Sequence, residues 1–133
     1  MINLPIYRAK KIDSDEYVMG WYSSPIIIEG KTYLSITNKE GEYRIDTTTL
    51  SIHFSDMLDS QGNKIFASLQ EDGKGGDKFL FDNEIFIIWF DNQSLKINAT
   101  NKDNFECSCH DSLQEWYDFN IKCYDLKVIG IQK

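Results

Sequence analysis

Residues 59–90, DSQGNKIFASLQEDGKGGDKFLFDNEIFIIWF, contain the stretch that decides which fold the sequence predicts. A glycine-dense loop at 73–76 lies between a short apolar segment and one of the most hydrophobic segments of the chain. A phosphate-binding loop needs the spacing GxxxxGK[ST] between a strand and a helix. GKGGDKFLF lacks that spacing and continues into a strand pattern, so no helix N-terminus follows it. We therefore expect a hairpin loop whose glycines supply positive φ, with Asp77 among the acidic residues that keep it soluble.

Apolar and polar residues alternate through most of the chain, and a period of two is typical of half-buried β-strands. Leu50, Ile52 and Phe54 are the clearest case, and their alternation predicts that His53 faces solvent. Strands are predicted at 6–11, 17–22, 26–36 (a hairpin with its turn at 29–31), 41–46, 50–54, 64–69, 78–81, 84–90, 94–100, 104–110 and 125–131. A helical turn is expected at 111–118, where SLQE matches a capping box. The predicted fold class is mainly β, a roll or barrel with at most one or two short helical turns.

The size of the chain suits one domain or two small lobes. It has 133 residues, of which 41% are hydrophobic, so a core can form. The turn-rich segment SDMLDSQGN at 55–63 is the best candidate for a boundary. We expect an N-terminal β lobe at 1–57 and a C-terminal β lobe at 58–133, packed together as one compact unit.

Acidic residues outnumber basic ones by 21 to 14, so the net charge is −7. Negative charge opposes binding to nucleic-acid phosphates and to anionic membranes, and Arg8 and Arg44 are the only arginines. We expect neither direct nucleic-acid binding nor membrane association. Two interpretations of the acidity stay open: it keeps the protein soluble, or it imitates nucleic acid as a decoy for nucleic-acid-handling enzymes.

The sequence predicts a cytoplasmic protein. MINLPIYRAKKIDSDEY has too few consecutive apolar residues for a signal peptide and lacks a small-residue cleavage site. The longest apolar runs, such as IFIIWF at 85–90, are far too short to cross a bilayer. Three cysteines, an odd number, fit a reducing compartment better than a disulfide framework.

Four soft metal ligands, Cys107, Cys109, His110 and Cys123, stand near the C-terminus. Structural zinc sites usually place two to four residues between the first two cysteines, whereas here there is one. Strand alternation would also put His110 on the opposite face from Cys107 and Cys109. We expect buried thiols that pack as small apolar side chains, and therefore no metal ion or other cofactor. A zinc site and a reactive thiol pair are the alternatives.

No catalytic signature is visible, so the protein is not expected to be an enzyme. No serine or cysteine lies in a recognisable nucleophile elbow, and only two histidines are present. Aromatic residues, in contrast, are more numerous than a small barrel needs. Trp116 and Tyr117 are adjacent, so one of them should point outward. With Trp21 and Tyr22 they form the candidate surface for a protein partner or for a homo-oligomer.

Four segments, in order, resemble the YopX-type proteins of phages and prophages. YRAKKIDSDEYVMGWY at 7–22 is similar to the opening of that family, and YRID at 43–46 to an extended Tyr-x-Val/Ile-Asp segment. DSQGNKIF at 59–66 is similar to the family's turn and strand Asp-x-x-Gly-x-x-Ile-Phe/Tyr, and DLKVIGI at 125–131 to its closing LEVIGNI strand. The chain departs from the family at Ala67, Ser68 and Leu69, where Glu-Gly-Asp is usual, and at 51–58, where SIHFSDML replaces a Gln-Tyr-Thr-Gly element.

The resemblance implies a small β-roll with an SH3-like C-terminal barrel, encoded by a phage or prophage and acting in the bacterial cytoplasm. It implies no active site. We therefore expect a non-enzymatic protein-interaction module that acts on a host or phage protein. The acidic decoy, and a small metal-binding protein that uses the three cysteines and His110, remain the alternatives.

Overall fold

The structure is a computed structural model, and it describes residues 5–23, 25–53, 58–59, 61–81, 83–91, 96–104, 111–112 and 127–133. These residues form a mainly β fold, which confirms the predicted class at that level. They contain no α-helix, and hence no helix long and apolar enough to span a membrane. Most strands belong to one large mixed sheet.

The strands of the described residues are, in chain order, β1 (Ile6–Lys11), β2 (Tyr17–Tyr22), β3 (Ile26–Ile28), β4 (Lys31–Tyr33), β5 (Ser35–Asn38), β6 (Gly41–His53), β7 (Ala67–Ser68), β8 (Asp77–Phe81), β9 (Glu84–Asp91), β10 (Lys96–Asn101), β11 (Asp111–Ser112) and β12 (Val128–Ile131). A short 3₁₀ helix, η1 (Lys102–Asn104), follows β10.

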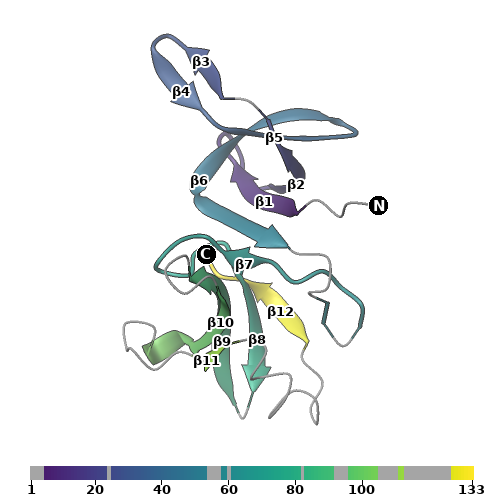
Figure 1. The fold of residues 1–133 in the computed structure, drawn as a ribbon, viewed down its shortest axis with the longest axis vertical. Helices are drawn as coiled ribbons and strands as arrows, with labels where there is room; N and C mark the ends of the chain where they lie inside the picture. Colours follow the sequence, from purple (N-terminus) through teal and green to yellow (C-terminus); the bar gives the residue numbers. More distant parts are fainter. Residues whose placement is uncertain are drawn as a thin grey trace.

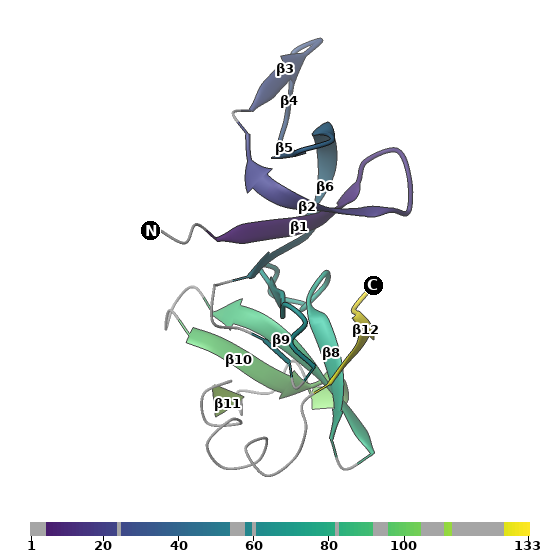
Figure 2. The same cartoon turned by 90° about the vertical axis from the view of Figure 1, so that its right-hand side faces the viewer.

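Strands of the N-terminal half form a closed circuit of antiparallel pairings (Figures 1 and 2). β1 pairs with β2, β2 with β5, β5 with β6, and β6 returns to β1. Gly20 lets β5 approach β2 closely, because a Cβ there would lie 2.2 Å from the Thr37 carbonyl oxygen. The β3–β4 hairpin protrudes from this half, and its turn has positive φ at Glu29 and Gly30. The predicted turn at 29–31 is thus confirmed.

The C-terminal half is built around β9 (Figure 2). β9 pairs antiparallel with β8 and β10, while β12 extends the sheet beyond β8 and β11 beyond β10. β7 connects this half to the first, because it pairs antiparallel with β6 and makes one parallel pairing with β9. Among the described strands, the pairing of β7 with β9 is the parallel one, and it makes the sheet mixed.

Each half contains its own hydrophobic cluster. The N-terminal cluster consists of Ala9, Val18, Ile36, Ile45 and Leu50. The C-terminal cluster consists of Ile52, Ile65, Ala67, Phe79, Ile88 and Ala99. Tyr7 and Leu69 pack against both clusters, and β6 supplies buried residues to both. Since burial of apolar surface is the main favourable contribution to folding, β6 couples the stability of the two halves.

The structure joins the predicted strands 41–46 and 50–54 into one strand, β6, of 13 residues. The β1–β6 register shifts between Arg8 and Lys10, as at a β-bulge. There the Thr49 hydroxyl accepts a hydrogen bond from the Lys10 N–H and donates one to the Asp46 carbonyl. A side chain thus replaces a missing ladder bond and lets the strand continue.

Two further predictions differ from the structure. The predicted strand 64–69 is extended only at Ala67–Ser68, in β7. Ser112, expected to cap a helical turn, instead pairs with Asn98 in β11. Asp111, the first residue of that turn, also lies in β11; residues 113–118 and the predicted strand 104–110, apart from Asn104, lie outside the described residues.

Candidate functional site

The glycine-dense loop between β7 and β8 is a packed structural element and not the tip of a hairpin. β7 pairs with β6 and β9, whereas β8 pairs with β9 and β12, so the two strands that the loop joins are not partners. Positive φ at Gly73 and Gly75 agrees with the prediction, but the predicted hairpin pairing is wrong. Parallel pairing of β7 with β9 brings this connection into the interior.

Backbone donors of the loop are all used within the protein. The N–H groups of residues 73–77 donate, in order, to Gln70 O, the Asp72 carboxylate, Gln132 O, Gly73 O and Phe66 O. An anion site needs N–H groups that point at the ligand. Since every N–H from 73 to 77 already has an acceptor, this loop cannot cradle a phosphate without breaking its own structure.

Gly75 and Gly76 are required because two strands pass very close to them. A Cβ at Gly75 would lie 2.0 Å from the Thr49 carbonyl oxygen in β6, and one at Gly76 would lie 2.3 Å from the Ile88 carbonyl oxygen in β9. Gly75 also has a φ of 87°, which side chains with a Cβ rarely adopt. The loop is therefore wedged between β6 and β9.

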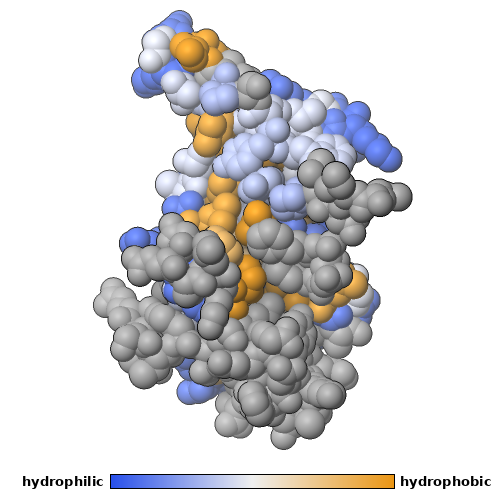
Figure 3. All heavy atoms as spheres, in the orientation of Figure 1, coloured by the Kyte–Doolittle hydropathy of each residue, from blue (hydrophilic) through white to orange (hydrophobic). Residues whose placement is uncertain are grey.

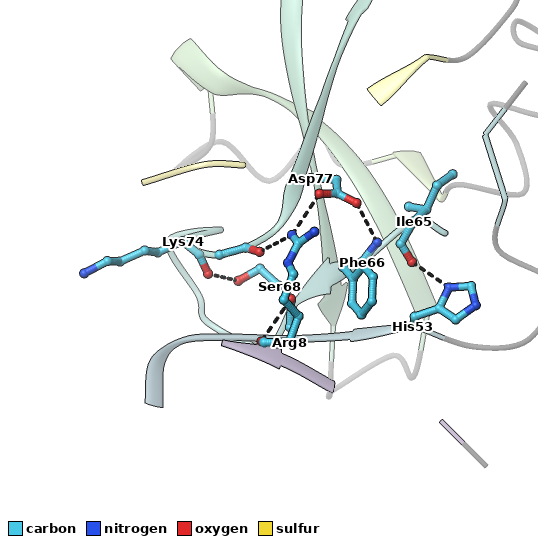
Figure 4. Close-up of polar contacts among 9 residues, drawn as sticks. Arg8, His53, Ile65, Phe66, Ser68, Lys74 and Asp77 are labelled. Carbon is cyan, nitrogen blue, oxygen red and sulfur yellow. Dashed lines mark hydrogen bonds and ion pairs between the residues drawn. The ribbon is translucent and has the colours of Figure 1, made fainter. Parts of the chain in front are cut away.

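Arg8 and Asp77 form a buried ion pair that links the two halves (Figure 4). Arg8 Nη2 lies 2.8 Å from Asp77 Oδ1 and donates to the Gly75 carbonyl oxygen at 2.8 Å. The guanidinium also lies over the Phe66 ring, 4.5 Å from its centroid. Asp77 Oδ2 accepts the Phe66 N–H at 2.8 Å. Asp77 is thus buried, contrary to the prediction that it stands in a soluble loop.

The ion pair is not fully hydrogen-bonded. Within the described part of the chain, Arg8 Nε and Asp77 Oδ1 lack a directed hydrogen bond, so the 2.8 Å contact is an ion pair without hydrogen-bond geometry. Burial raises the pKa of Asp77 above its ordinary value, and the positive charge of Arg8 opposes this shift. Removing one partner of such a pair leaves an uncompensated buried charge, which is strongly destabilising. We interpret it as a structural link between the halves.

His53 is buried and not exposed, which corrects the sequence prediction. Its Nδ1 lies 2.9 Å from the Ile65 carbonyl oxygen and its ring is 5.5 Å from that of Phe66. Residues 49–53 of β6 are all buried, because both faces of the strand are covered there. Alternation therefore does not indicate exposure in this part of β6. Burial lowers the pKa of His53 below its ordinary value, although the Ile65 carbonyl opposes this.

The other predicted site residues divide into two groups. Cys107, Cys109, His110 and Cys123 lie outside the described residues, as do Trp116 and Tyr117. Among the residues that the structure does describe, no cluster of three potential metal ligands occurs. Trp21 and Tyr22 are both described, and both are partly exposed on β2. Tyr22 packs against Tyr7, with ring centroids 4.5 Å apart.

Exposed apolar side chains occur at the end of β2 and on the β3–β4 hairpin. Met19 and Trp21 alternate with the buried Val18 and Gly20, so they share the outer face of β2. They are 51% and 47% exposed. Ile27, on the protruding hairpin, is 74% exposed, and the hairpin is coloured hydrophobic in part in Figure 3. Met19 and Trp21 lie close together on this face, and adjacent exposed apolar side chains of this size favour an interaction surface.

A groove of about 210 Å³ lies beside Trp21 and spans the two halves of the protein. Its apolar part comes from β1 and β2, and its polar part from the β5–β6 turn and from the segment before β7. The lining residues are Ile6, Met19, Gly20, Trp21, Asn38, Lys39 and Lys64. We call this hollow the Trp21 groove.

The β5–β6 turn is held firmly against β2. Asn38 Nδ2 donates to the Met19 carbonyl oxygen at 3.0 Å, and Asn38 Oδ1 accepts the Glu40 N–H at 2.8 Å. Lys39 lies between these two anchored residues. The Asn38 side chain therefore fixes the turn that forms one wall of the groove.

A second hollow of about 380 Å³ lies between β1, the β3–β4 hairpin and β6. Its charged side chains carry both signs, and several already have partners. Lys11 pairs with Glu16 at 3.0 Å and lies 4.4 Å from the Tyr43 ring centroid, while Arg44 lies 5.1 Å from that of Tyr33. Because its charges have both signs and several already interact with other residues, this hollow is a weaker candidate for a binding site than the Trp21 groove.

Sequence reasoning identified Trp21 but not the residues that surround it. Met19 could have been found, because it precedes Trp21 by two positions in a predicted strand. Lys39 and Lys64 lie 25 positions apart in turn-rich segments, and no local pattern connects them. Likewise, no local pattern predicts the ion pair between Arg8 and Asp77, which are 69 positions apart.

Comparison of the chain with protein-family models, with curated proteins and with solved structures found no match. The function is therefore inferred from the geometry of the chain itself.

Proposed function

We propose that this chain is a non-enzymatic protein-interaction module of the YopX type, encoded by a phage or prophage and acting in the bacterial cytoplasm. The observation that carries the interaction role is the exposed apolar surface formed by Met19 and Trp21, with Ile27 on the neighbouring hairpin. Aromatic and methionine side chains are enriched at protein interfaces and dominate their binding energy.

The YopX resemblance is supported by where its four segments lie. Residues 7–22 contain most of β1, a turn and β2, and YRID lies in β6. In the segment 59–63, the Asp59 carboxylate accepts the N–H groups of Gln61 and Asn63, as is typical of a turn. VIGI forms β12. β1, β2, YRID and β12 are compatible with the resemblance, whereas Ile65 and Phe66 of DSQGNKIF precede β7 and are not part of a strand.

An SH3-like arrangement of the C-terminal strands is the finer part of this proposal. β8, β9 and β10 are consecutive and antiparallel, and β12 returns to pair with β8. Three meandering strands with a returning terminal strand are compatible with such a barrel. The pairings among the described residues do not close into one in this half.

Two acidic residues are unsuitable for the alternative role of a phosphate-imitating decoy. Asp77 is buried against Arg8, and Asp59 is buried in its turn, where hydrogen bonds lower its pKa despite the opposing effect of burial. Their carboxylates stabilise the fold. Because these two carboxylates are unavailable and no observation favours a decoy, we propose only the interaction role.

The proposal is tested with purified protein as bait in a lysate of the source bacterium. Wild-type protein is compared with Trp21→Ser and Met19→Ser variants, each checked for folding by circular dichroism. Leu80→Ser is the matched control, because Leu80 is equally exposed but lies on β8 in the other half. We expect proteins captured by the wild type and the control to be lost with both β2 variants.

Two results would contradict the proposal: reproducible capture that ignores both β2 substitutions, or no specific capture by the wild type in any growth phase. Light scattering after size-exclusion chromatography measures the molar mass and so tests whether the partner is a second copy of the chain. A wild-type dimer that dissociates in the Trp21→Ser variant would identify a homo-oligomer.

A further inference from the structure

Among the described residues that line the Trp21 groove, both charged ones are positive, although the whole chain carries a net charge of −7. They belong to Lys39 and Lys64, which come from different turns. Among the described residues, no ion pair or hydrogen bond engages either ammonium group. Positive charge is therefore concentrated at this groove against the overall balance of the molecule.

Both lysines stand on anchored backbone. Asn38 fixes the turn that carries Lys39, as described above. Lys64 pairs with Leu58 in an isolated bridge, directly after the turn that the Asp59 carboxylate holds. A ligand would not need to order these two turns, which reduces the entropic cost of binding.

The size of the groove indicates what can enter. Small-molecule and cofactor sites usually measure about 300–1,000 Å³. The Trp21 groove, at about 210 Å³, lies below that range. It suits one apolar side chain and a neighbouring short group. Met19 and Trp21 supply an adaptable and a rigid apolar wall, respectively, for such a side chain.

We infer that the Trp21 groove binds an acidic segment of a partner protein, with an apolar side chain against Met19 and Trp21 and a carboxylate near Lys39 and Lys64. The inference rests on the proposed function and specifies the chemistry of the partner. A peptide is favoured over a nucleic acid because the groove is mainly apolar and the rest of the protein is acidic.

A random 12-residue peptide library selected on the full-length protein tests the inference. The wild type is expected to enrich peptides with Asp or Glu within two positions of Leu, Ile, Met or Phe. The double variant Lys39→Glu/Lys64→Glu is expected to lose this preference. Lys31→Glu/Lys102→Glu is the matched control, because it changes the net charge equally at two exposed lysines away from the groove.

A synthetic peptide from the enriched set gives the quantitative result. Its Kd should rise by about tenfold or more in the groove double variant and stay within about twofold in the control. It should also rise with salt concentration, as expected for partly exposed charges. In NMR titrations the peptide should shift the backbone resonances of Met19, Gly20 and Lys39 most.

Three results would overturn the inference: no acidic preference among selected peptides, equal weakening in both double variants, or displacement of the peptide by single-stranded DNA at equal charge concentration. These results are distinct from a failure of the proposed function. The proposed function fails if the Trp21→Ser variant still captures every protein that the wild type captures. If the variant loses those proteins but the wild type shows no preference for acidic peptides, only the inference fails.

Discussion

Arg8 and Met19 are cross-strand partners on one face of the β1–β2 pair, yet their environments are opposite. Directly paired residues of an antiparallel sheet point to the same side. The charged Arg8 is 8% exposed beneath Phe66, Gly75 and Asp77, whereas the apolar Met19 is 51% exposed in the Trp21 groove. This face thus has a sealed region, around Arg8, Phe66, Gly75 and Asp77, and an open region, around Met19 and Trp21.

The comparison shows that the polarity of a residue does not decide its burial when a second element covers only part of a face. The segment 65–77 lies over Arg8 and provides both a carboxylate and a carbonyl for it. Among the described residues, Lys64 lines the groove beside Met19 without a carboxylate or carbonyl partner of the kind that Arg8 has. We expect changes in the sealed region to affect folding and changes in the open region to affect binding.

The largest effect is expected from breaking the buried ion pair. Asp77→Asn should lower the free energy of unfolding by about 3–5 kcal/mol, because it leaves the Arg8 charge buried without compensation. Replacing both residues, as Arg8→Met with Asp77→Leu, should recover most of this loss. Urea unfolding followed by circular dichroism measures both changes.

A matched control for the ion pair is Glu16→Gln, which breaks the exposed pair with Lys11 and should leave stability unchanged. A loss in the double variant equal to the sum of the losses in the two single variants would mean that the two charges are not coupled.

The next largest effect concerns the glycine loop. Gly75→Ala should destabilise the protein by about 1–3 kcal/mol from its positive φ alone, with a further loss from overlap with the Thr49 carbonyl. Gly62→Ala is the control, since Gly62 has a similar φ of 82° but nothing lies within 4 Å of an added Cβ. Thermal unfolding should separate the two, and similar melting temperatures would refute close packing of the loop.

A smaller effect is expected from protonation of His53, which packs against Phe66 in the sealed region. Because burial lowers the pKa of His53, the folded state takes up a proton at lower pH than the unfolded chain, whose imidazole titrates near its ordinary value of 6.5. Stability should therefore be constant above that pH and fall as the pH drops below it. His53→Gln should remove this dependence. Parallel stability curves for the two proteins between pH 7 and 5 would exclude His53 as its source.

The smallest effect on stability is expected in the open region. Trp21→Ser and Met19→Ser each remove a side chain that is about half exposed, so the free energy of unfolding should change by less than about 1 kcal/mol. The same variants should abolish capture of a partner. A loss of several kcal/mol in urea unfolding would instead assign Trp21 to the core and remove the contrast between the two regions.

Local patterns were sufficient for the elements. Period-two alternation predicted β1, β2, β8 and β9 close to their observed bounds, and the EGK turn predicted the β3–β4 hairpin. Trp21 was selected as a candidate surface residue from its aromatic character and is half exposed. These features depend on a few neighbouring residues, so the sequence contains them directly.

Long-range pairing was not predictable in the same way. Alternation placed His53 in solvent because it assumes one covered face, whereas β6 is covered on both faces at 49–53. The loop at 73–76 was expected to close a hairpin, and β7 instead pairs parallel with β9. The local sequence does not distinguish these outcomes, because each depends on which distant strand pairs with the segment.

By itself, then, the sequence determined a mainly β protein, the positions of most strands and the glycines of its turns, because these follow from steric preference and from side-chain period over a few residues. Tertiary structure alone decided that Arg8 meets Asp77 across 69 positions, and that Met19, Trp21, Lys39 and Lys64 line one groove. The physical reason is that burial and charge are properties of assembled surfaces, which form only when strands distant in the chain pack together.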